Sequence, residues 1–204
     1  KVNSASTFSL GHAITANAVS LEGGCASSGG TISGASTLTL GGNVTVTDNT
    51  GGTNGATISC PVALGATRIF TVADDGTSAN DLTLSSIISG SFGVTKDGQG
   101  TLRVSALNTY TGTTTISQGI LSAGTIVVSS SASNIGNASS AVVLGGSSTS
   151  GSLSYTGSAA TFTRGFTVNA GGGSIINTTS NLLTIGTGGI ATTGSVTLSN
   201  SSSG

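Results

Sequence analysis

Short stretches of alternating apolar and polar residues recur along this chain at fixed distances. Moving residues 32–48 forward by 26 positions superimposes one set of residues on another: Ile32 on Ile58, Leu38 on Leu64, Val44 on Phe70, Val46 on Val72 and Asp48 on Asp74. Two further offsets, of 20 and of 96 residues, superimpose Leu82 on Leu102, Leu84 on Val104 and residues 68–72 on 164–168. Self-similarity at this period is typical of solenoids and propellers. Offsets of 20 to 26 suit one coil of a β-solenoid, and 96 suits about four coils.

The repeating units have the pattern of strands. Alternation with period two and β-branched residues predicts strands, and Gly, Asn, Asp and Ser at the boundaries predict turns. The clearest alternating stretches are 38–40, 44–46, 70–72, 82–84, 102–104, 153–155, 166–168 and 196–198. No window shows a sustained apolar period of 3.6 residues, so we expect an all-β chain.

The composition suits a narrow stacked coil. The 204 residues include 36 Ser, 34 Thr and 34 Gly, which suggests disorder, but 35% are hydrophobic and the mean hydropathy is +0.32. The chain must therefore bury apolar surface, and small and β-branched side chains do so in thin layers. A sandwich or barrel is the competing architecture, and it normally relies on more aromatic anchors than the five Phe and two Tyr present. We predict one β-solenoid domain over residues 1–204, with parallel coils of about 20–26 residues.

The scarcity of charge excludes several functions. Charged residues make up 5% of the chain, with a net charge of −1, so there is no basic field for nucleic acid or for a membrane surface. No apolar run is long enough to span a bilayer. The chain starts at Lys1 without a secretory leader, so we expect a mature or excised region. Ionisable groups are too few for a convergent catalytic site, and we expect no enzyme activity, no cofactor and no metal ion.

One segment of about 35 residues, 90–124, carries a specific motif. It contains Gly-x-x-Gly-Val-Thr-Lys ending at Lys96, a glycine pair before a leucine, an Asn-Thr-Tyr-Thr-Gly turn and a Gly-x-Leu strand start. The motif positions are Lys96, Gly98, Gly100, Leu102, Asn108, Tyr110, Gly112 and Gly119. This segment resembles the passenger-associated repeat of bacterial autotransporter proteins, and a looser resemblance extends over 68–198.

The resemblance implies a right-handed parallel β-helical passenger on the bacterial cell surface or secreted from it. Such passengers are usually adhesive or structural, so the resemblance implies partners among host or matrix glycans and proteins. We expect a non-enzymatic extracellular module of a surface adhesin. A carbohydrate- or ice-binding solenoid is the alternative, and a glycan-cleaving enzyme is a more distant one.

The two cysteines, Cys25 and Cys60, lack the partners of a zinc site, since the chain has one His and no Cys-x-x-Cys. An extracellular context favours a disulfide between nearby coils, which would close a loop of 35 residues. The alternative is two separately buried thiols.

We expect a structural role for the other candidate residues, which are the acidic cluster, His12 and the turn at 108–112. Asp74, Asp75 and Gly76, with Asp48 and Asp81, could supply paired carboxylates with Arg68 as a basic partner, but Asp-Asp-Gly is ordinary turn chemistry. His12 has no partner nearby and is expected to be structural or exposed. Residues 108–112 are expected to form a turn, with Tyr110 as an exposed ligand-stacking ring in the alternative.

Two features of the sequence suggest binding surfaces: the Thr pairs along the chain and the uncapped terminal coils. Thr pairs at 37/39, 45/47, 113/115 and 161/163 could match an ice lattice, although they do not recur at coil distance. Neither terminus shows a capping helix, so the terminal coils would expose unpaired backbone groups that favour strand addition. We therefore expect a self-assembling fibre in which copies join end to end, with residues 1–9 of one copy meeting 196–204 of the next through Val2, Phe8, Val196 and Leu198.

Overall fold

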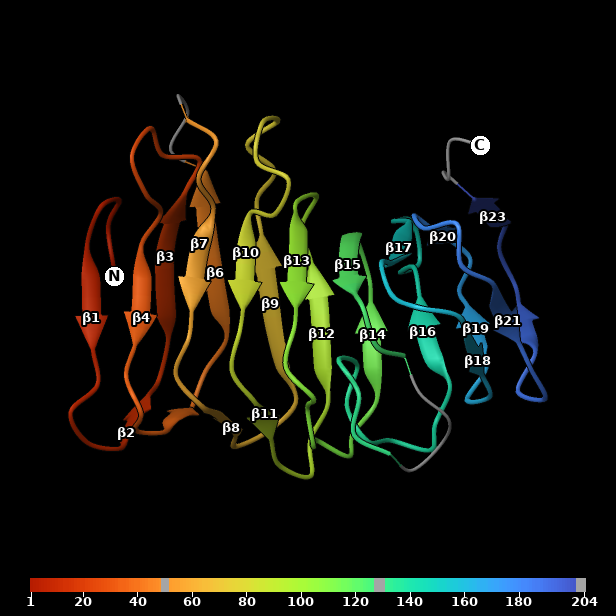
Figure 1. The fold of residues 1–204 in the computed structure, drawn as a ribbon, viewed down its shortest axis with the longest axis horizontal. Coiled ribbons are helices and arrows are strands. Elements are labelled where there is room, and N and C mark those ends of the chain that lie inside the picture. The colour runs from red at the N-terminus through yellow and green to blue at the C-terminus, as the bar shows by residue number, and fades with distance from the viewer. Residues whose placement is uncertain (49–51, 127–130, 201–204) are drawn as a thin grey trace.

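The computed structural model describes residues 1–48, 52–126 and 131–200. Its strands follow one another in a stack of coils along one long axis (Figure 1). Every ladder between described strands is parallel, which confirms the all-β parallel solenoid. The right-handed sense stays a prediction of the family resemblance. No helix in the described ranges is long and apolar enough to span a bilayer.

The largest face is a nine-stranded sheet. Its strands, in spatial order, are β1 (Thr7–Ser9), β4 (Thr31–Ser33), β7 (Ala56–Ile58), β10 (Leu82–Leu84), β13 (Thr101–Val104), β15 (Gly119–Ala123), β17 (Gly151–Tyr155), β20 (Gly173–Asn177) and β23 (Val196–Asn200). This sheet contributes one strand to each coil from the first to the last. It is therefore the most continuous surface of the rod.

A second face is an eight-stranded sheet. Its strands are β3 (Val19–Gly23), β6 (Val44–Asp48), β9 (Arg68–Val72), β12 (Val94–Asp97), β14 (Thr114–Ile116), β16 (Val142–Leu144), β19 (Phe166–Val168) and β22 (Ile190–Thr192). The third face is discontinuous. It has a four-stranded sheet of β2 (Ile14–Ala16), β5 (Leu38–Leu40), β8 (Val62–Leu64) and β11 (Ile88–Ser89), and a two-stranded sheet of β18 (Ala160–Phe162) and β21 (Leu183–Ile185).

Apolar residues at alternate strand positions stack in files inside the coils. On the nine-stranded sheet one file runs from Leu82 through Leu102, Leu121 and Leu153 to Ile175, all nearly or fully buried. Neighbouring coils repeat at about 4.8 Å, so each side chain packs on the equivalent one in the next coil. The narrow interior explains why medium-sized aliphatic residues suffice.

The offsets found in the sequence are mostly the true register. Ile32 pairs with Ile58, Val44 with Phe70 and Leu82 with Leu102. Four strand-to-strand steps separate β9 from β19, as the longer offset predicts.

The predicted match of Leu38 with Leu64 is wrong, because Leu38 pairs with Val62 and Leu40 with Leu64. The chain takes two residues fewer from Ile58 to Val62 than from the paired Ile32 to Leu38, and it takes two more from Leu64 to Phe70 than from Leu40 to Val44.

The coil length also varies more than expected. Thr101 pairs with Ile120, a spacing of 19 residues, whereas Gly119 pairs with Gly151, a spacing of 32. The long coil carries the chain between β15 and β16, which includes the undescribed residues 127–130. Solenoids absorb such insertions at corners because the stacked strands on either side keep their register.

Candidate functional site

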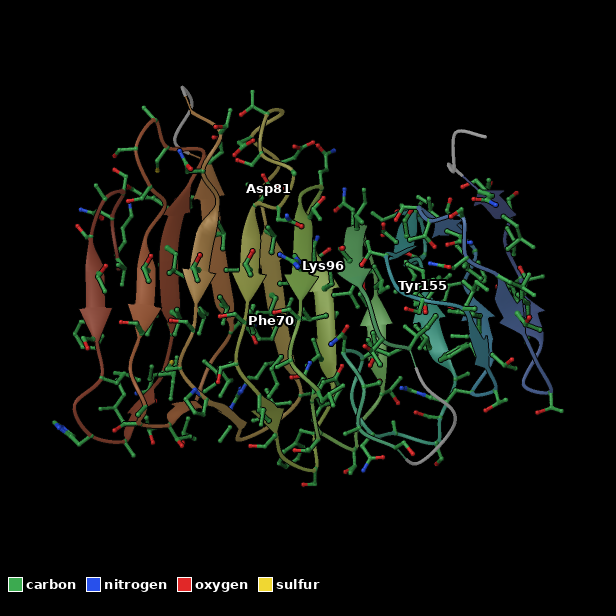
Figure 2. The ribbon with its side chains drawn as sticks, viewed as in Figure 1. Phe70, Asp81, Lys96 and Tyr155 are labelled. Atoms are coloured by element: carbon green, nitrogen blue, oxygen red, sulfur yellow. The ribbon has the colours of Figure 1, made fainter. Side chains whose placement is uncertain are left out.

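The motif of residues 90–124 covers β12 to β15 in the middle of the rod, and Lys96 is its most unusual member. The Lys96 side chain occupies an inward position on β12, paired with Phe70 on one side and Ile116 on the other, and it is fully buried. Its Nζ donates to the carbonyl oxygens of Asp97 at 2.9 Å, Gly98 at 2.7 Å and Gln118 at 3.1 Å. Figure 2 labels it near the middle of the rod. All three donors of the ammonium group are therefore used structurally.

Burial lowers the pKa of Lys96 to about 8, with the charges of Asp97, Asp81 and Asp74 opposing the shift. The unfolded chain keeps the usual value of about 10.5, so between pH 8 and 10.5 the unfolded state binds the extra proton and stability rises with pH.

We expect the stability difference between the wild type and Lys96→Met to grow by about 2 kcal/mol in favour of the wild type from pH 7 to pH 9.5. Chemical unfolding of both proteins at each pH measures it. Taking the difference cancels the other groups that titrate in this range. A difference that does not change with pH would contradict the shifted pKa.

The motif glycines gather around Lys96. Gly98 has a φ of +79°, and a Cβ there would lie 2.4 Å from the Val72 carbonyl oxygen. Gly119 has a φ of +69°, and its Cβ would lie 2.3 Å from the Gly98 oxygen and 2.7 Å from that of Gly100. Only glycine combines a left-handed backbone with this close approach. At this corner the backbones of neighbouring coils therefore approach closely, with glycines facing carbonyl oxygens. The Gly98 oxygen also accepts a hydrogen bond from Lys96.

The other motif residues form a separate buried network at a different corner. The Asn108 Oδ1 accepts from the Ile88 N–H at 2.8 Å, and its Nδ2 donates to the Asn134 carbonyl at 2.5 Å. Tyr110 is buried rather than exposed, so the alternative of a ligand-stacking ring at this turn is wrong. Its hydroxyl lies 2.8 Å from the Thr114 hydroxyl, and burial raises the pKa of Tyr110 to about 12. Leu102 lies in the apolar file of the nine-stranded sheet, and Gly112 packs against the backbone of the preceding coil.

Two further members of this network carry no sequence motif. The Asn134 Oδ1 accepts from the N–H groups of Gly124 and Thr125 at 2.8 and 2.7 Å. Arg164 is buried, and it donates through Nη1 to the Ile135 carbonyl and through Nε to the Ser140 carbonyl, both at 2.9 Å. The repeat of residues 68–72 at 164–168 singled out Arg164, but nothing in its spacing indicated which carbonyls it would reach.

The expected disulfide is not formed, and both cysteines are free and buried. Cys25 lies where the chain leaves the eight-stranded sheet. Its backbone forms an isolated antiparallel β-bridge with Asn54 of the next coil. Cys60 lies six residues beyond Asn54, at the far end of β7. Largely extended chain of that length spans on the order of 15–20 Å, whereas a disulfide needs Cα atoms closer than about 7 Å. The alternative of two separately buried thiols is confirmed.

The acidic residues form a turn. Oxygens of Asp74, Asp75 and Asp81 lie within 4.8 Å of one another. They accept hydrogen bonds from backbone N–H groups, as when Asp81, which is buried near the start of β10 (Figure 2), accepts from Thr101 at 2.7 Å. Arg68 is not their partner, because its Nε donates to the Leu40 carbonyl at 2.8 Å.

Other predicted positions lie at the surface or at the ends. His12 is exposed, as one expectation had it. Phe8 and Leu198 are exposed by 51% and 61%, whereas Val196 is half-buried. Val2 forms a parallel bridge with Leu21 of its own chain and so extends the eight-stranded sheet beyond β3 at this end. Residues 201–204, which belong to the expected contact segment, lie outside the described residues.

Hydroxyl groups do form a regular file, but not the one that the Thr pairs suggested. Thr7, Thr31, Thr57 and Thr83 stack on the outer face of the nine-stranded sheet. Ser122 and Ser154 continue the same line further along, on the other side of Arg103. The spacings of 24 and 26 residues hid this file from an inspection of adjacent pairs.

With this geometry established, comparison with known proteins identifies the motif. Residues 94–123 match the family model described as "Passenger-associated-transport-repeat". The match lies within the segment that resembled the passenger repeat, and it confirms that resemblance. No solved structure showed a significant match.

A curated relative extends the comparison to most of the chain. The "Adhesin BmaC autotransporter" of Brucella suis biovar 1 (strain 1330) is 35% identical over 153 residues, which cover 73% of this chain. The matched region is 4% of the length of that relative. The chain is therefore distantly homologous to a short stretch of a very long autotransporter adhesin.

Proposed function

We propose that this chain is an adhesive, non-enzymatic segment of an autotransporter passenger, displayed at the bacterial cell surface or secreted from it. The observation that carries the proposal is the homology to an autotransporter adhesin over 73% of the chain, on a solenoid whose nine-stranded face is continuous. The buried Lys96, Asn108, Tyr110 and Arg164 hold coils together. In this proposal the core supplies rigidity, and the lateral faces supply adhesion.

Adhesion of coated beads tests this function. Beads carrying the chain are expected to be retained on extracellular matrix or epithelial cells under flow more strongly than beads carrying an unrelated β-solenoid of similar charge. Equal retention of the two kinds of bead would overturn the adhesive role. Release of soluble oligosaccharides from matrix polysaccharides would overturn the non-enzymatic role and support a glycan-cleaving one.

Exposed apolar residues at both ends support a second proposal, that each terminal coil packs on another coil. Phe8 lies at one end, and Leu182 and Leu198 lie at the other, exposed by 71% and 61%. The partner coil would come from neighbouring repeats or from a second copy joined head to tail, and such a contact propagates rather than closes. Sedimentation velocity is expected to show concentration-dependent oligomers that Leu198→Lys disperses. Monomers at all concentrations would exclude assembly of copies of this chain.

A further inference from the structure

Three hollows follow one another along the outer face of the nine-stranded sheet. The first, of about 330 Å³, lies over the Thr file at Thr31, Thr57 and Thr83. The second, of about 410 Å³, shares Asn80 with the first and contains Arg103. The third, of about 420 Å³, shares Arg103 with the second and ends beyond β20. Together they form one trough, which we call the lateral groove.

The lateral groove is long for a molecule of this size. It runs from the start of β4 to the end of β20, which is six strand-to-strand steps. At about 4.8 Å per step this is roughly 29 Å along the axis of the rod. A ligand that fills the groove must therefore be extended, and the groove has room for several units of a polymer.

Most side chains that line the groove carry a hydroxyl or an amide, and Val104 and Ile120 are its larger apolar members. Its polar side chains include Thr31, Thr57, Thr83, Asn80, Ser105, Ser122, Ser154 and Thr156. Asn54, Asn134 and Asn181 also line it, but their amide groups already donate to backbone carbonyls. Among the residues that the structure describes, no Phe, Tyr or Trp lines any of the three hollows. Within the described part of the groove a peptide would find no aromatic pocket for a large apolar side chain. Of the described strands of this sheet, only the first and the last offer a free edge to an added strand.

Arg103 gives the groove its charge. It is exposed on the outer side of β13, between Thr83 and Ser122, where the second and third hollows meet. Within the described residues its guanidinium makes no hydrogen bond or ion pair, and no Asp or Glu lines the groove. A free guanidinium fork suits a carboxylate, to which it donates two parallel hydrogen bonds.

Resting on the proposed adhesive function, we propose that the lateral groove binds a linear polysaccharide that carries carboxylate groups. Sugar hydroxyls pair with the Ser and Thr side chains and with Asn80 along the groove, and Arg103 binds a uronate carboxylate midway. Ice is a poorer occupant, because Arg103 interrupts the hydroxyl file and the face is hollowed rather than flat.

Binding of defined oligosaccharides tests the proposal. Hyaluronan, polygalacturonate and alginate decasaccharides are compared by calorimetry with the same molecules after methyl esterification of their carboxylates. We expect at least one acidic decasaccharide to bind, and esterification to weaken it about tenfold, which corresponds to one charge-assisted hydrogen-bonding pair. Arg103→Gln should weaken the acidic form by the same factor and leave the ester unchanged.

A second variant tests the position of the ligand without changing charge. Thr57→Tyr places a bulky side chain in the first hollow, and Thr45→Tyr is the matched control, since Thr45 points outward on β6 of the eight-stranded sheet. Only Thr57→Tyr should weaken binding. Equal affinities for both variants and the wild type would overturn the groove as the site.

The outcome separates this inference from the adhesive function. If beads carrying the chain adhere but no acidic decasaccharide binds, adhesion stands and the polysaccharide groove is wrong. If Thr57→Tyr instead abolishes a dimer seen by sedimentation and no oligosaccharide binds, the groove is a contact between copies of this chain, and the proposal is overturned.

Discussion

Asn108→Ala is expected to lower the free energy of unfolding by about 3 kcal/mol, because it leaves two buried backbone groups without partners. The Ile88 N–H loses its acceptor and the Asn134 carbonyl loses a donor. Both lie in a corner that is closed to water, so neither group regains a hydrogen bond. Chemical unfolding followed by far-ultraviolet circular dichroism measures the change.

Asn43→Ala is the matched control for this prediction. The Asn43 Oδ1 accepts from the Ile69 N–H of the next coil at 3.1 Å, which is the same kind of contact, but at an exposed position. Water can replace the lost acceptor there, so we expect a loss below about 1 kcal/mol. Losses of equal size in the two variants would show that burial of the Asn108 network does not contribute.

Gly98→Ala is expected to cost about 3–4 kcal/mol, the sum of a left-handed backbone and a steric contact. The φ of Gly98 is +79°, and the added Cβ would lie 2.4 Å from the Val72 carbonyl oxygen, so the two coils would have to separate. The Lys96 ammonium group donates to the carbonyls of this corner, so the same displacement would also distort its hydrogen bonds. Thermal and chemical unfolding measure the loss.

Gly76→Ala separates the two contributions. Gly76 has a φ of +72°, close to that of Gly98, but no atom of the described residues lies within 4 Å of a Cβ added to it. We expect it to cost about 1 kcal/mol, the backbone contribution alone. If Gly76→Ala destabilised the chain as much as Gly98→Ala, the close approach of coils at Gly98 would not matter to stability.

The stacking of strand residues could be predicted from the sequence, whereas the lengths of the corners between strands could not. Strand positions follow period two, and their stacking repeats the same apolar type, so Leu82 and Leu102 can be matched from their spacing. Leu38 could not, because the corners on either side of it differ by two residues from those of the next coil. Corner length is set by local turn geometry, which leaves little trace in hydrophobic pattern.

The buried polar residues show the same limit. The motif predicted that Asn108 and Tyr110 belong to a turn. It did not indicate their hydrogen-bond partners, Asn134 and Thr114, which lie 26 and 4 residues further along the chain. An insertion that includes undescribed residues brings Asn134 into this corner. The expected disulfide was wrong for a related reason, since an offset along the chain does not say at which corner of the coil a cysteine lies.

By itself the sequence determined the class of this protein, a parallel β-solenoid with a narrow aliphatic core and the motif of an autotransporter passenger. The solenoid follows from periodicity and local composition, and the passenger motif from the resemblance of residues 90–124 to a known repeat; all of these are properties of the chain in one dimension. Only the tertiary structure decided which side chains meet between coils: Lys96 on three carbonyls, Arg164 on Ile135, and Arg103 within a groove of hydroxyls. Those contacts depend on the length of every corner that precedes them. Only when the coils stack do residues far apart in the sequence become neighbours.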